Sequence, residues 1–200
     1  RYTVTNAAAN TFELEDEDGN PIDGSAFNAY VEGGYARKAV LTVSGLWHLE
    51  GQEVAVLSNG DVVNDLTVAN GILTLPRKSS RVHVGLRYTS DVETLNIETP
   101  QGTIQGKLKR VVSATIRFYK SRGLWIGPDA DNLTEMKQRE FEDYNEPTNL
   151  LTGDKTIIIE SGWDSNGRVF MRQRDPLPLT ILAVVPNFQV GDQEVREDMT

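Results

Sequence analysis

The sequence predicts a mostly β protein built from antiparallel β-sandwich or β-barrel modules. The first observation behind this prediction is the spacing of turn residues. Short runs rich in Val, Ile, Thr and Leu are separated by pairs such as Asn59-Gly60 and Asn70-Gly71. Asn-Gly readily adopts the positive φ angles of tight hairpin turns, so this spacing is typical of antiparallel strands.

The second observation is the alternation of apolar and polar side chains within these runs. In residues 111–119, Val112, Ala114, Ile116 and Phe118 alternate with polar residues, as expected for a half-buried strand. Residues 179–185 are apolar on both faces, which predicts a central strand. The other strands are expected at residues 2–5, 11–14, 38–43, 53–57, 72–75, 81–86, 156–160 and 169–174.

The sequence leaves room for at most one short helix. Asn132 or Thr134 is a candidate N-cap for a helix over residues 133–141, with an irregular loop as the alternative. A turn at residues 99–102 separates two strand-rich halves. We therefore expect β-rich modules at residues 1–98, barrel-like, and 99–200, sandwich-like, which can also pack as one unit.

Composition narrows the classes of function. The chain has 200 residues, a net charge of −9 and no cysteine. The lack of cysteine excludes thiol nucleophiles, thiolate zinc sites and disulfides, and the negative charge argues against general polyanion binding. No apolar run is long enough for a membrane-spanning helix. The chain starts with Arg1 rather than Met, in an apparent strand, so we expect it to be a piece of a longer protein.

No motif points to a metal or a cofactor. The chain has two histidines, His48 and His83, and neither belongs to a metal-binding pattern. Its Gly-rich segments lack the phosphate-binding glycine motifs, and its serines lack the nucleophile elbow of hydrolases. We expect no catalytic residues, no cofactor and no metal site.

Carboxylate pairs keep one enzymatic alternative open. Asp61 with Asp65, or Asp129 with Asp131, could serve glycoside hydrolysis, which uses two acids at a defined separation. Among 29 acidic residues such pairs also arise by chance. The segment from Asp129 to Asn132 resembles the start of a calcium loop, but the glycine and the terminal Glu of that loop do not follow.

Two sets of residues are candidates for binding. No acidic residue occurs between residues 105 and 123, and this stretch is rich in Lys and Arg. It could form a solvated strand face, a protein interface or a phosphate contact. The three tryptophans lie near turns and could cover sheet ends or stack on sugars or bases. The candidates are Lys107, Lys109, Arg110, Arg117, Lys120 and Arg122 as interface or channel-lining residues, and Trp47, Trp125 and Trp163 as exposed aromatics.

Several phrases resemble the bacteriophage tail nozzle family, also called tail tubular protein B or stabilisation protein. They are residues 45–60 (GLWHLEGQEVAVLSNG), 71–75 (GILTL) and 81–90 (RVHVGLRYTS). Residues 2–6, 11–14, 111–123 and 162–179 extend the likeness over most of the chain. Family members are usually several times longer, so the resemblance implies that this chain is a fragment or a shortened relative.

The resemblance implies a non-enzymatic structural protein of the virion tail. Its subunits would form a ring, commonly a hexamer, contact other tail proteins and pass double-stranded DNA transiently during ejection. Assembly would take place in the cytoplasm of the bacterial host. A negative chain suits a conduit, because each Lys or Arg contact to phosphate would slow the passage of DNA. The alternatives are a tail receptor or carbohydrate-binding module that uses its Trp side chains, and a polysaccharide-cleaving tail enzyme.

Overall fold

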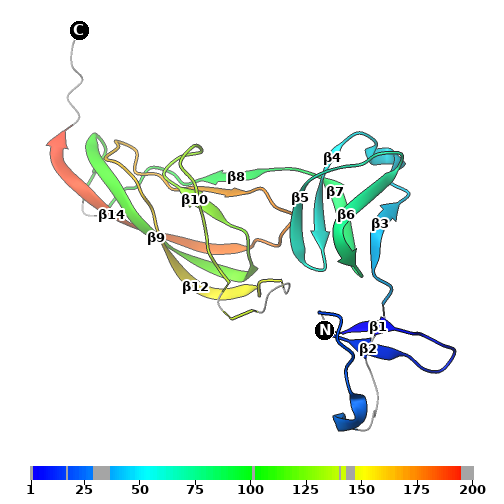
Figure 1. Cartoon of the computed structure of the whole chain (residues 1–200). Coiled ribbons are helices and arrows are strands. Elements are labelled where there is room, and N and C mark those ends of the chain that lie inside the picture. Colours follow the sequence, from blue (N-terminus) through cyan, green and yellow to red (C-terminus); the bar gives the residue numbers. More distant parts are fainter. Residues whose placement is uncertain are drawn as a thin grey trace. The chain divides into compact units, whose positions relative to one another are not determined.

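The computed structural model describes residues 2–16, 18–28, 37–100, 102–139, 141–142 and 147–194 (Figure 1). The fold is mostly β, with antiparallel pairing in every sheet of the described residues, as predicted. The contacts divide the chain into two compact units, Arg1–Ala39 and Val40–Thr200. No helix in the described part of the chain is long and apolar enough to cross a membrane.

The first unit contains a short hairpin and a single helical turn. Strands β1 (Thr3–Thr5) and β2 (Glu13–Glu15) pair with each other. The 3-10 helix η1 (Gly24–Ala26) is capped by Asp23, whose carboxylate accepts a hydrogen bond from the Ser25 amide.

The second unit begins with a small β-sandwich, here called the first sandwich. Its core is drawn from both of its sheets, and Val54, Val56, Leu73 and Leu75 are among the buried residues. The 3-10 helix η2 (Trp47–Leu49) adds Leu49 to this core. One sheet has the order β5 (Asp61–Thr67), β4 (Glu53–Ser58), β7 (Val82–Leu86), and the other pairs β3 (Val40–Ser44) with β6 (Ile72–Ser79).

The Asn-Gly pairs form the tight turns that the sequence predicts. Asn59 and Gly60 have φ angles of 51° and 97° and connect β4 to β5. The Asn59 side chain also accepts hydrogen bonds from the backbone amides of Ser80 and Arg81, at 3.1 Å each. These bonds tie the turn to the start of β7, so one asparagine organises two strand connections.

The rest of the chain forms a second sandwich around a separate core. Strand β9 lies at the centre of one sheet and buries Ala114, Ile116 and Phe118 on one face, as its alternation predicts. A register shift between β9 and β14 places Val111 in the core, whereas Val112 is only half-buried. The sheet orders are β12 (Leu151–Ile158), β9 (Lys107–Ser121), β14 (Ile181–Glu194) and β11 (Thr134–Glu135), β10 (Trp125–Gly127), β13 (Phe170–Gln173), β8 (Ser90–Glu93).

Two local predictions are wrong. In its described part, residues 133–139 and 141, the segment expected to be a helix forms the short strand β11 and irregular backbone, the alternative left open, because the Met136 amide donates to the Leu124 carbonyl instead of to its own turn. Residues 179–185 contribute to β14, which lies at the edge of its three-stranded sheet and not at the centre. Strands β5, β8, β10 and β11 were not expected.

The boundary between modules remains a prediction. The sequence places it after residue 98, whereas the contacts divide the chain after Ala39. Strand β8 precedes residue 98 but pairs with β13, with Phe170 opposite Glu93. The chain therefore leaves the first sandwich and enters the second sandwich before β8.

Candidate functional site

The two histidines do not form a site. His48 lies in η2 and His83 in β7, and both are exposed. Within the described ranges, no three His, Asp or Glu residues are grouped so that they could hold a metal ion.

Of the six basic candidates, Lys109 is buried and Arg122 is half-buried, and both donate hydrogen bonds to backbone carbonyls. Lys109 is only 1% exposed, and its Nζ donates to the carbonyls of Ser165 at 2.7 Å and Lys107 at 3.3 Å. Arg122 donates from Nη1 to the Thr148 carbonyl at 2.9 Å and from Nη2 to the Gly60 carbonyl. Burial lowers the pKa of the Arg122 guanidinium. Both cations use hydrogen-bond donors within the fold, and an interface role for them remains a prediction.

Three of the remaining candidates lie at the surface and are spread along β9. Arg117 forms a two-point ion pair with Asp154 on β12. Arg110 donates from Nε to the Ser161 carbonyl at 3.0 Å, and the Lys120 Nζ lies 5.4 Å from the centre of the Tyr119 ring. Lys107 is half-buried. The stretch is therefore not one basic patch, and an interface role for its exposed members remains a prediction.

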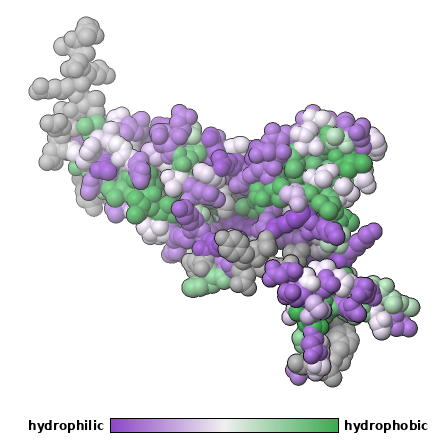
Figure 2. All heavy atoms as spheres, in the orientation of Figure 1, coloured by the Kyte–Doolittle hydropathy of each residue, from purple (hydrophilic) through white to green (hydrophobic). Residues whose placement is uncertain are grey.

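The edge strand β14 exposes apolar residues. Leu182 is 60% exposed and Val185 is 61% exposed, while Val184 and Phe188 pack against the core on the other face. In the space-filling view, apolar residues reach the surface on both sandwiches (Figure 2). Within the described residues β14 pairs only with β9, so its second edge is open.

The tryptophans occupy different surroundings. Trp47 is 70% exposed and rests one side of its ring against Gly71. Trp163 is 49% exposed and lies near Gly191. Trp125 is half-buried and lines a cavity in the second sandwich.

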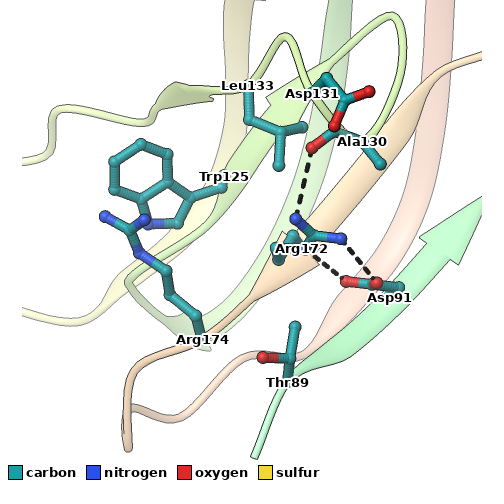
Figure 3. Close-up of a pocket in the computed structure, with 8 residues that line it drawn as sticks. All are labelled: Thr89, Asp91, Trp125, Ala130, Asp131, Leu133, Arg172 and Arg174. Atoms are coloured by element: carbon teal, nitrogen blue, oxygen red, sulfur yellow. Dashed lines mark hydrogen bonds and ion pairs between the residues drawn. The ribbon is translucent and has the colours of Figure 1, made fainter.

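This cavity has a volume of about 550 Å³ and is formed by β8, β10, β13 and the loop that follows β10 (Figure 3). Its polar lining includes Asp91 from β8, Arg172 from β13 and Asp131 from the loop. Arg172 donates to the two carboxylate oxygens of Asp91 at 2.7 and 2.9 Å and to the Ala130 carbonyl at 3.3 Å. The hydrogen bonds from Arg172 hold the pKa of Asp91 below its usual value.

Arg174 lies above Trp125 on one side of the cavity. Its guanidinium carbon is 3.6 Å from the centre of the indole ring, a close cation–π contact. The indole Nε1 is buried and has no hydrogen-bond partner in the described part of the chain. Figure 3 shows the two side chains stacked, with Asp131 and Leu133 on the neighbouring loop.

The loop that carries Asp131 is held in shape by Asp129. The Asp129 carboxylate accepts hydrogen bonds from the backbone amides of Asp131 and Asn132 and from the Asn132 side chain, each at 2.9 Å. These contacts lower the pKa of Asp129, and the hydrogen bond from the Asn132 side chain has the largest effect. A general acid needs a raised pKa, so Asp129 itself is not suited to that role.

Sequence reasoning found Trp125 but not the residues around it. Arg172 and Arg174 are two positions apart at the end of β13, and this spacing places two side chains on one face of an extended chain. That signal was present in the sequence. Their proximity to Trp125 depends on the pairing of β10 with β13, which no local pattern reveals.

Comparison with known proteins adds no relative. No protein-family model matches this sequence, and no match was found among curated proteins.

Proposed function

We propose that this chain is a wall module of a bacteriophage short-tail nozzle, which helps to form the conduit for DNA ejection. It acts through contacts with copies of itself, as part of a ring, and with other tail proteins. The proposal assigns it to the virion tail and gives it no catalytic role. It rests on the sequence resemblance and on one structural observation, the open edge of β14.

The edge of β14 is suited to assembly. A strand edge carries unpaired backbone donors and acceptors, and a long apolar edge is a template for pairing with another chain. Strand β14 has 14 residues and exposes Leu182 and Val185. Pro186 interrupts its backbone donors once, which an edge strand tolerates. A contact along the part of β14 before Pro186 would place a second chain beside Leu182 and Val185.

Apolar residues on both faces of β14 support the same proposal. This pattern predicts a strand covered on both sides, yet the fold covers only the side of Val184 and Phe188. The side of Leu182 and Val185 is left at the surface. A subunit contact would complete the burial that the sequence pattern anticipates.

Sedimentation velocity over a range of protein concentrations tests the proposal. We expect the wild-type chain to self-associate and Val185→Lys to stay monomeric, because a charge on an edge strand opposes pairing. Gln105→Lys adds the same charge at an exposed position outside the strands and is the matched control. A wild-type chain that stays monomeric, or a Val185→Lys variant that associates like wild type, would contradict the proposal.

A further inference from the structure

The cavity beside Trp125 holds a cation with unused hydrogen-bond donors. Arg174 stacks on the indole ring but makes no hydrogen bond or ion pair within the described residues. A guanidinium has five N–H donors. Arg172, in contrast, is engaged by Asp91 and the Ala130 carbonyl. Arg174 is therefore the donor that the cavity offers to a ligand.

The opposite wall offers an acceptor. The Asp131 carboxylate lines the cavity and accepts no hydrogen bond in the described part of the chain, although its backbone amide donates to Asp129. The turn around Asp129 fixes the backbone that carries Asp131. The backbone that carries the acceptor is thus held before any ligand binds, which reduces the entropy lost on binding.

The remaining lining is apolar and includes Leu133, Ala130 and the ring of Trp125. The charged lining residues are two acids, Asp91 and Asp131, and two arginines, Arg172 and Arg174, so the cavity has no net formal charge. A cationic ligand would be repelled by the two arginines, and an anionic ligand would be repelled by Asp131. A neutral ligand that both donates and accepts hydrogen bonds and has an apolar face fits this lining best.

We propose that this cavity binds a neutral pyranose unit of a saccharide, with Arg174 donating to its hydroxyl oxygens and Asp131 accepting from its hydroxyl groups. The C–H face of the sugar packs on Leu133 and on the edge of the Trp125 ring. The cavity volume of about 550 Å³ lies in the range of small-ligand sites. The site is one of binding only, and it goes beyond the proposed structural role.

The test is ligand-observed NMR on the full 200-residue chain, with the methyl glycosides of glucose, mannose and galactose as neutral probes. Glucuronate and inorganic phosphate serve as anionic probes. We expect saturable binding of at least one neutral glycoside. Arg174→Gln and Asp131→Asn should each weaken it about tenfold or more, because each removes a charged hydrogen-bonding partner.

Matched controls separate binding from folding. Glu135→Gln changes an exposed carboxylate on β11, outside the cavity lining, and Trp163→Phe changes an aromatic residue elsewhere in the same sandwich. Both should bind as wild type does. Wild-type melting temperatures for Arg174→Gln and Asp131→Asn would show that their loss of binding is local.

Three results would overturn the inference: no saturable binding of any neutral glycoside, binding of the anionic probes alone, or equal affinity in the wild type and both cavity variants. Weaker glycoside binding in both Arg174→Gln and Asp131→Asn, accompanied by a lower melting temperature in both variants, would also count against the inference. The assay does not depend on assembly of the tail. Its failure would leave the proposed wall function untouched.

Discussion

Arg117 on β9 and Asp154 on β12 face each other across the outer surface of the second sandwich, with Nε–Oδ1 and Nη2–Oδ2 distances of 2.7 and 2.8 Å. Arg117 belongs to the acid-free basic stretch of residues 105–123, and Asp154 pairs with it from the neighbouring strand. Its hydrogen bonds hold the pKa of Asp154 below the usual value and raise the pKa of Arg117. The pair neutralises a charge that would otherwise be available to phosphate.

The pair predicts a stability difference at low pH. A carboxyl group with a lowered folded-state pKa stabilises the fold above its unfolded pKa, and this contribution is lost as the pH falls through the folded value. Asp154→Asn should therefore flatten the decrease in stability below about pH 4. Thermal melts of wild type and variant from pH 7 to pH 2 measure this. Parallel curves throughout would contradict it.

Removal of the Lys109 ammonium should destabilise the protein. Lys109→Met removes the 2.7 Å hydrogen bond that the buried Lys109 ammonium donates to the Ser165 carbonyl, and a hydrogen bond made by a charged group contributes about 1.5–3 kcal/mol. Lys120→Met, at an exposed position of the same strand, should change stability by less than about 0.5 kcal/mol. Urea unfolding of the two variants gives the comparison. Equal losses would show that Lys109 does not act through its buried contacts.

Gly71 and Gly51 allow backbone strain to be separated from a steric clash. Both have positive φ, 67° and 71°. A Cβ at Gly71 would lie 2.6 Å from the Trp47 ring, whereas a Cβ at Gly51 would meet nothing within 4 Å. Gly51→Ala should cost about 1–2 kcal/mol from the left-handed conformation alone, and Gly71→Ala should cost more.

A double variant identifies the cause. Trp47 is largely exposed, so Trp47→Ala can remove the ring with little loss of core packing. In that background the cost of Gly71→Ala should fall to the cost of Gly51→Ala. If the destabilisation by Gly71→Ala stayed the same without the Trp47 ring, a clash with the indole would not be its cause.

The isolated chain should bind duplex DNA only weakly. Its net charge is −9, Lys109 and Arg122 are packed into the fold, and Arg117 is paired with Asp154. Three of the six basic candidates are thus engaged within the fold, and the excess of acidic residues opposes binding to phosphate. A gel-shift titration at about 150 mM salt should give no submicromolar complex. Tight or sequence-dependent binding would contradict the proposed conduit, which must let DNA pass.

The sequence could predict those features of the fold that depend on residues close together in the chain. The φ angles of Asn59 and Gly60 and the buried face of Ala114, Ile116 and Phe118 follow from local backbone preference and from a two-residue period. The predicted helix after Asn132 failed because the Met136 amide bonds to the distant Leu124 carbonyl. Local propensity cannot anticipate such a tertiary contact.

The rest depends on pairing between distant segments. Trp125 meets Arg172 and Arg174 only because β10 pairs with β13. Likewise, the apolar pattern of residues 179–185 shows that both faces need cover, but not whether this chain or another molecule provides it. The core covers the face of Val184 and Phe188, whereas the face of Leu182 and Val185 is exposed.

The proposed function requires this chain to form part of the wall of a ring. Electron microscopy of the protein expressed from its full natural reading frame tests it most directly. We expect closed rings, commonly six-fold, in which β14 lies at or beside the contact between subunits. Val185→Lys should disrupt these rings. Monodisperse single subunits at high concentration, or rings in which β14 faces solvent and Val185→Lys has no effect, would contradict it.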